Sequence, residues 1–197
     1  GTRLAVVSHD LDPEELKPDS LKTKNPKPIV LDRYAFKRDN TGYLDRLRDH
    51  VYIVDVATKK AVQITTGDFD DQSVRWSPDG KRLALTLSSA AGNLDVHVLE
   101  LESGTLTRVT EHPAIDTEPV WASDGTALFF TSDRAGGPQI YRAAPVAAAA
   151  VQRVSFSGSY NARARPSPDG RQLAHVTREG GAYRIAVLAL QSGAARV

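Results

Sequence analysis

Short segments in which apolar and polar residues alternate recur along the chain, and turn-forming residues separate them. Such alternation is typical of antiparallel strands. One type of segment occurs three times, as KRLALTL (81–87), TALFFTS (126–132) and RQLAHVT (171–177). In each unit it is followed by a second segment, such as LDVHVLEL (94–101), and a third, such as TLTRVT (105–110). The pattern predicts repeated units of short β-strands.

A phrase that ends in glycine precedes each of the three segments: WSPDG (76–80), WASDG (121–125) and PSPDG (166–170). In the two phrases that contain Pro-Asp-Gly, Pro presets a type I turn. In all three, Asp caps the turn through its side chain, and Gly adopts the left-handed conformation that closes the hairpin. We therefore predict tight turns, whose structural residues are Asp79, Gly80, Asp124, Gly125, Asp169 and Gly170.

The last residues of these phrases, Gly80, Gly125 and Gly170, lie 45 residues apart. A repeat of this length indicates one supersecondary unit per repeat. Each unit has four strands once the strand that runs into the phrase is counted. Such units, with no helical pattern between them, are typical of β-propeller blades, whereas the rival β-sandwich requires no such period. The sequence thus predicts an all-β fold, with one β-propeller domain over residues 1–197 and the Trp residues packed between neighbouring sheets.

The start of the chain matches the middle of such a unit. GTRLAVVS (1–8) is similar to GKRLALTL (80–87), and HVYIVDV (50–56) and AVQIT (61–65) continue the unit. We therefore expect four blade units, of which the first lacks its leading strand. An unpaired sheet edge invites pairing. The expected outcomes are a closed four-bladed ring with an imperfect first blade, or self-association of two chains through that blade.

An insertion at residues 11–46 interrupts this first unit. Its first half is rich in proline and in charges of both signs, which is the composition of a solvated loop. Within it, PIVLDRYAF (28–36) could add a further strand.

Composition and charge narrow the possible functions. Hydrophobic residues make up 41% and charged residues 25% of the chain, as in ordinary globular domains. The net charge is +1, so we expect no nucleic-acid binding. No apolar run is long enough to span a bilayer, and no membrane insertion is expected. The chain has no Cys, which excludes disulfides.

The longer sequence strings resemble two families of propeller. The string VLDRYAFKRDNTGYLDRLRDHVYIVDVATKKAVQITTGDFDD (30–71) resembles the propeller of prolyl oligopeptidase-family serine peptidases of the acylaminoacyl-peptidase type. The later part resembles TolB, the periplasmic component of the Tol–Pal envelope system. The strings that carry this second resemblance are WSPDGKRLALTLS (76–88), HPAIDTEPVW (112–121), FTSDRAGGPQIYR (130–142) and SGSYNARARPSPDG (157–170).

These resemblances predict a chimeric or engineered propeller, peptidase-like over residues 1–72 and TolB-like over 73–197, with a junction near 71–74. The first hypothesis for function is a non-enzymatic hybrid scaffold with at most a protein-binding role. The second is a TolB-like partner-binding protein of the Tol–Pal system, periplasmic by that resemblance. The third is a gating propeller fragment of a serine peptidase.

Catalytic and metal sites are not expected. In the peptidases of the family named above, the catalytic triad lies in a separate domain with a G-x-S-x-G turn, and this pentapeptide does not occur here. The five histidines lack metal-ligand spacing, and DFDD (68–71) lacks the glycine-punctuated spacing of a calcium loop. We predict no catalytic residue, no metal and no cofactor.

The expected interaction surface consists of the loops that lead into each blade, residues 66–72, 111–119 and 156–164, here called the lead-in loops. Propellers commonly bind proteins there, because rigid sheets hold these loops in place around the channel mouth. The TolB resemblance implies that Thr117 faces the lipoprotein Pal, while the matching His of TolB falls near Asp70. The predicted contact residues are Asp70, Thr117, Glu118, Tyr160, Asn161 and Arg163.

Overall fold

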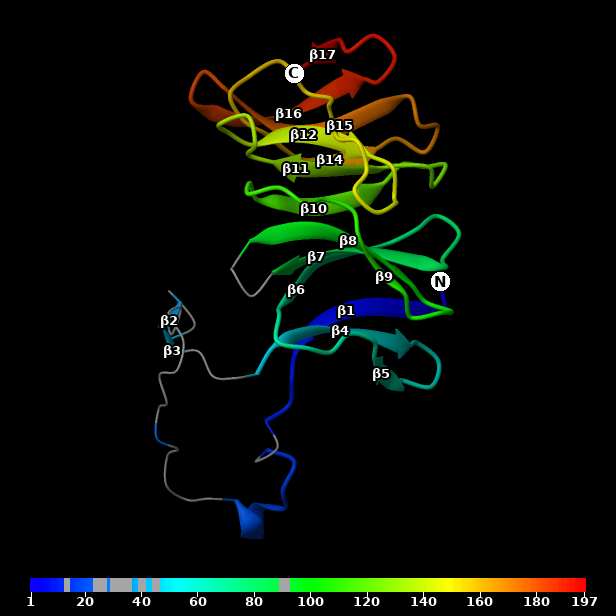
Figure 1. Ribbon diagram of the computed structural model, residues 1–197, viewed down its shortest axis with the longest axis vertical. Helices are drawn as coiled ribbons and strands as arrows, with labels where there is room; N and C mark the ends of the chain where they lie inside the picture. Colours follow the sequence, from blue (N-terminus) through cyan, green and yellow to red (C-terminus); the bar gives the residue numbers. More distant parts are fainter. Residues whose placement is uncertain (13–14, 23–27, 29–36, 39–41, 44–46, 89–92) are drawn as a thin grey trace.

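Four antiparallel sheets follow one another along the chain and lie side by side in sequence order (Figure 1). The computed structural model describes residues 1–12, 15–22, 28, 37–38, 42–43, 47–88 and 93–197. The predicted all-β fold of repeated sheets is therefore confirmed. Among the described residues the only helix is the 3-10 turn η1 (Asp19–Leu21), and the short hairpin of β2 (Lys37–Arg38) and β3 (Gly42–Tyr43) lies in the inserted segment.

In the second, third and fourth sheets, strands that are neighbours in the sheet are also consecutive in the sequence. In the first sheet, β1 pairs with β4 because the β2–β3 hairpin is inserted between them. The first sheet consists of β1 (Arg3–His9), β4 (Asp49–Asp55) and β5 (Ala61–Gln63). The second consists of β6 (Asp71–Trp76), β7 (Arg82–Ser88), β8 (Leu94–Glu100) and β9 (Leu106–Arg108). The third consists of β10 (Asp116–Trp121), β11 (Leu128–Ser132), β12 (Gln139–Ala143) and β13 (Gln152–Arg153). The fourth consists of β14 (Asn161–Pro166), β15 (Gln172–Glu179), β16 (Ala182–Ala189) and β17 (Ala195–Arg196).

The first strand of each later sheet packs against the sheet before it. β6 contacts β1 and β4, β10 contacts β6, β7 and β8, and β14 contacts β10, β11 and β12. The first and fourth sheets lie at opposite ends of this array (Figure 1). The closed ring of four blades is therefore not the observed arrangement, and association of two chains stays a prediction. Apart from Pro28, the segment 28–36 lies outside the described residues.

The hydrophobic core lies between the sheets, in three separate layers. In β7, Leu83 and Leu85 join the cluster that faces the first sheet, whereas Ala84 joins the cluster that faces the third. This alternation buries both faces of the second sheet, which explains the continuous apolar run of β7. Trp76 packs in the first layer and Trp121 in the second, so the expectation that Trp residues pack between sheets is confirmed.

A turn that ends in Asp-Gly joins the first two strands of each later sheet, and Pro precedes the Asp in the second and fourth sheets. Gly80 has a φ of +69°, and its backbone N–H donates to the Ser77 carbonyl at 2.9 Å. The Asp79 carboxylate accepts from the Ser77 hydroxyl at 2.5 Å and from the Lys81 backbone N–H at 3.1 Å. These two hydrogen bonds hold the pKa of Asp79 below its usual range. Gly125 and Gly170 have the same left-handed conformation, with φ of +71° and +69°.

Candidate protein-binding surface

The lead-in loops are tied to neighbouring strands by backbone hydrogen bonds. The Asn161 N–H donates to the Pro138 carbonyl of the preceding sheet at 2.8 Å, and the Arg178 N–H donates to the Tyr160 carbonyl at 3.1 Å. In the second sheet the Ser88 N–H donates to the Asp70 carbonyl at 3.3 Å. The loops are therefore held by the sheets, as a preformed binding surface requires.

A buried polar side chain starts the first strand of each later sheet. Asp71 and Asp116 are fully buried, and Asn161 is 1% exposed. Asp71 accepts through Oδ2 from the Thr65 hydroxyl and, at 3.0 Å, from the Val51 backbone N–H, both of the preceding unit. Burial raises the pKa of Asp71 above its usual range. This position joins the second sheet to the first, because its partners belong to the first unit.

Asn161 is a structural residue of this kind, and its role as a contact residue stays a prediction. Its side-chain Nδ2 donates to Gln139 Oε1 at 2.9 Å and to the Ser157 carbonyl at 2.7 Å. Its Oδ1 lies 2.9 Å from His175 Nε2. The buried side chain thus joins β14 to the preceding sheet through Gln139 and to β15 through His175.

In the first strand of the second, third and fourth sheets, the third residue has a strained backbone. Ser73, Glu118 and Arg163 have φ of +53°, +55° and +59°, and none of them is glycine. The pairing of β6, β10 and β14 with the next strand shifts register at these positions, as in a β-bulge. A non-glycine residue in this conformation costs on the order of 1 kcal/mol, and such strain concentrates at functional sites. The structure thus marks one recurrent position on three neighbouring strands.

Two of the predicted contact residues meet at this position. Arg163 donates through Nε to Glu118 Oε1 at 3.2 Å and through its backbone N–H to Glu118 Oε2 at 3.2 Å. The Thr131 hydroxyl donates to the same Oε2 at 3.0 Å. The Arg163 side chain is 68% exposed and that of Glu118 is 27% exposed. The Arg163 guanidinium therefore remains accessible to a partner while Glu118 orients it.

A further positive charge at this surface was not predicted. Arg75 is exposed on β6, and partial desolvation followed by the nearby Arg165 lowers its pKa, whereas Glu118 opposes this effect. Arg75 and Arg165 make equivalent contacts, donating through Nη1 to the carbonyls of Val74 at 2.8 Å and Ala164 at 2.7 Å. Each of the two is the second-to-last residue of its strand. The sequence repeat could therefore have identified them as equivalent positions.

The remaining predicted residues occupy separate places. Tyr160 packs edge-on against Tyr183, with ring centroids 5.4 Å apart. Thr117 is half-buried in β10, directly opposite Thr131. Asp70 accepts from the Asp49 backbone N–H at 3.1 Å, near the junction of the first two sheets.

The DFDD segment does not gather its carboxylates. Asp68 pairs with Arg48, while Asp71 is buried among partners of the first unit. Across the part of the chain that the structure describes, no group of His, Asp and Glu is arranged to hold a metal ion. In the same residues no helix is long and apolar enough to cross a membrane.

The stacked antiparallel sheets, of which the first has three strands and the other three have four, define a β-propeller protein. Residues 20–197 match the family described as the TolB beta propeller domain, and the chain belongs to this family. This match extends across the predicted junction at 71–74, and the hybrid origin of the chain stays a prediction.

Individual relatives agree with this assignment. The Tol-Pal system protein TolB of Bordetella pertussis (strain Tohama I) is 46% identical over 48 residues, which are 24% of this chain and 11% of that protein. The crystal structure of TolB from Acinetobacter baumannii superposes with a TM-score of 0.69 at 36% identity, covering 75% of this chain and 37% of that one. The matched region thus spans well under half of either relative.

A peptidase shares the fold. The structure of a puromycin-hydrolysing peptidase from Mycobacterium tuberculosis superposes with a TM-score of 0.61 at 18% identity, covering 81% of this chain and 27% of that one. At this identity the likeness shows the fold alone. Propellers of peptidases are therefore among the structural neighbours, as the sequence resemblance predicted.

Proposed function

We propose that the chain is a protein-binding propeller module of a Tol–Pal-type system, located in the periplasm, and that its partner is the lipoprotein Pal. The observation that carries this proposal is the recurrent strained position of Ser73, Glu118 and Arg163 beside the lead-in loops. Strain that recurs at three equivalent non-glycine positions points to a use for their geometry. Membership in the TolB family and the TolB relatives support the choice of system. This function replaces the hybrid scaffold as the leading hypothesis.

The chemistry of the surface suits binding. The exposed guanidinium of Arg163 lies beside the carboxylate of Glu118, and the charge of Arg165 reaches Arg75. Such a mixed, mainly positive patch would complement an acidic or mixed-charge protein surface. The sequence of residues 1–197 has no G-x-S-x-G motif, so no catalytic motif supports a peptidase reaction in these sheets. We therefore infer binding without catalysis.

Titration calorimetry with the soluble domain of Pal tests the proposal. We expect binding by the unaltered chain, and an at least tenfold higher Kd for Arg163→Glu. Thr117→Ala should also weaken the complex. Arg171→Glu is the matched control, because Arg171 is exposed and follows a Pro-Asp-Gly turn outside the lead-in loops. No binding by the unaltered chain, or equal loss in the control, would overturn the proposal.

A further inference from the structure

At each of the first two interfaces between sheets, an Arg guanidinium stacks on a Trp indole, and the two pairs occupy equivalent positions. The Arg3 guanidinium lies over the Trp76 ring, 5.2 Å from its centroid, and the Arg82 guanidinium lies over the Trp121 ring at 4.4 Å. Each Arg comes two residues after its turn glycine, and each Trp comes four residues before the next one. The repeat therefore places one stacked Arg–Trp pair between successive sheets.

Both members of this pair are replaced at the third interface. Pro166 stands at the Trp position, and Ala127 stands at the Arg position. In the second sheet, Ala84 lies on the face that packs against the third sheet. The equivalent residue of the third sheet is Phe129, which packs against the fourth sheet. Phe129 is therefore the aromatic side chain in the core cluster of this interface.

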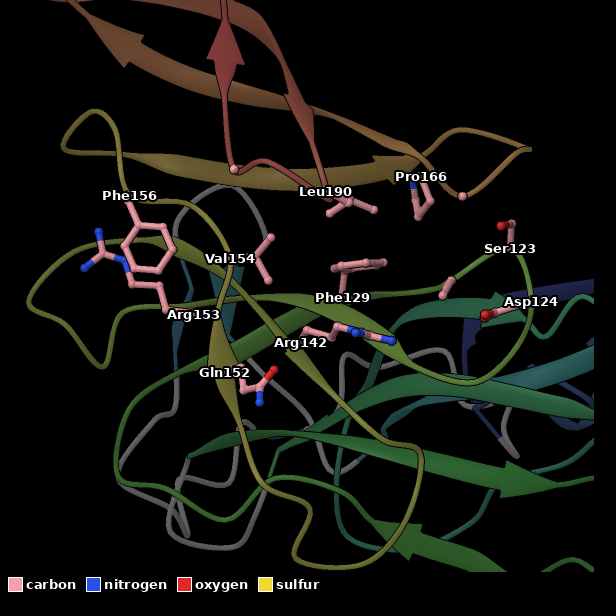
Figure 2. Close-up of a pocket in the computed structure, with 13 residues that line it drawn as sticks. Ser123, Asp124, Phe129, Arg142, Gln152, Arg153, Val154, Phe156, Pro166 and Leu190 are labelled. Carbon is pink, nitrogen blue, oxygen red and sulfur yellow. The ribbon is translucent and has the colours of Figure 1, made fainter.

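A pocket of about 340 Å³ lies at this place, between the third and fourth sheets (Figure 2). Its apolar wall includes Phe129, Val154, Pro166 and Leu190. This volume lies within the ~300–1,000 Å³ typical of small-molecule sites. This pocket lies where the Arg–Trp pair is replaced, whereas the pocket of about 300 Å³ at the first interface is lined by Arg3 and Trp76 themselves.

Arginine side chains supply the polar wall of the pocket. Arg142 corresponds to Val98 of the second sheet, and Figure 2 shows it extending past Phe129 toward Asp124. Among the described residues no hydrogen bond or ion pair is found for its guanidinium, although its charge helps to lower the pKa of Asp124 in the same pocket. Arg153 also lines the pocket, but it donates to the Ser155 carbonyl at 2.6 Å. Arg142 is thus the cation that a ligand can engage.

We propose that this pocket binds a small planar aromatic carboxylate. The ring would take the place that an indole occupies at the other two interfaces, against Pro166, Phe129 and Leu190. The carboxylate would pair with the Arg142 guanidinium, whose fork of donors matches two oxygens. The two lining arginines outnumber the single lining carboxylate, Asp124, which favours an anion over a cation.

Indole-3-acetate is the probe, and tryptamine, which has the same ring with a positive charge, is its matched control. Titration calorimetry on the unaltered chain should show binding of indole-3-acetate and at least tenfold weaker binding of tryptamine. Absence of indole-3-acetate binding at millimolar concentration, or equal binding of the two probes, would overturn the proposal.

Three variants locate the site. Pro166→Trp restores the residue of the other interfaces, so it should fill the pocket, abolish binding and raise the Tm. Arg142→Gln keeps the shape and removes the charge, so the Kd should rise at least tenfold. Arg184→Gln is the control, because Arg184 is exposed on β16 and does not line the pocket. Unchanged binding in Arg142→Gln contradicts the proposal even if Pro166→Trp fails to fold.

Discussion

Glu118 joins the third sheet to the fourth through Arg163, with the two residues bonded at 3.2 Å through both the side chain and the backbone of Arg163. Because Thr131 also donates to this carboxylate, Glu118→Ala leaves several donors without their acceptor. We expect a loss of about 1–2 kcal/mol in the free energy of unfolding, measured by urea denaturation.

The matched control for this prediction is Glu111→Ala. The Glu111 carboxylate pairs with Arg108 at 3.0 Å, and its own side chain is 72% exposed. An exposed pair of this kind is worth about 0–1 kcal/mol. An equal loss in both variants would show that the Glu118 contact does not join the sheets.

The turn glycines differ in what surrounds them, which gives a second prediction. A Cβ at Gly80 meets nothing within 4 Å, so Gly80→Ala should cost about 1 kcal/mol through backbone strain alone. A Cβ at Gly170 lies 2.8 Å from Ser123 Oγ. Gly170→Ala should therefore cost more, and the double change with Ser123→Gly should return the loss to that of Gly80→Ala. Urea denaturation measures all three, and equal losses in the two single variants would contradict the contact.

Trp121 is the largest side chain of the second core layer. It is 4% exposed, and its Nε1 donates to the Arg75 carbonyl at 3.2 Å. Trp121→Ala should lower the free energy of unfolding by roughly 3–5 kcal/mol, because it leaves a cavity and an unpaired carbonyl. Trp76→Ala is the comparison, since Trp76 is only half-buried. Thermal unfolding should show the smaller drop in Tm for Trp76→Ala; the reverse order would conflict with the observed packing.

Asp71 makes stability depend on pH in an unusual direction. Burial raises its pKa in the folded protein, so the unfolded chain loses this proton at lower pH than the folded chain does. Its contribution to stability is present below the unfolded pKa of about 3.9 and is lost as pH rises through the folded pKa. The stability of Asp71→Asn relative to the unaltered chain should therefore increase between pH 3 and pH 7.

Asp79 provides a control of opposite sign. Hydrogen bonds from Ser77 and Lys81 lower its pKa in the folded protein. Its contribution is present above the unfolded pKa and is lost as pH falls through the folded pKa. Asp79→Asn should therefore lose stability relative to the unaltered chain as pH rises. Urea denaturation across this pH range should give opposite slopes, and parallel slopes would contradict the assigned causes.

Local patterns predicted the fold well. Strand alternation and the Pro-Asp-Gly phrase depend on neighbouring residues, so the sheets and turns follow directly from them. The contact surface was harder, because Glu118 and Arg163 are 45 residues apart and meet only through the stacking of sheets. The buried contacts of Asn161 were not predicted, because a position in a loop segment does not reveal that its side chain points toward the preceding sheet.

The sequence pattern also did not predict how the four sheets are arranged relative to one another. The repeat specifies that each sheet packs on the next, but the angle between sheets decides whether four of them close a ring. That angle depends on packing between sheets, and the residues packed there, such as Trp121 and Phe129, contact residues far away in the sequence.

The central claim is that the lead-in loops bind a protein partner. Hydrogen–deuterium exchange of the chain with and without the soluble domain of Pal tests it most directly. The account predicts new protection in residues 66–72, 111–119 and 156–164, and none in the turns at 77–80, 122–125 and 167–170. Protection confined to those turns, or no change anywhere in the chain, would contradict it.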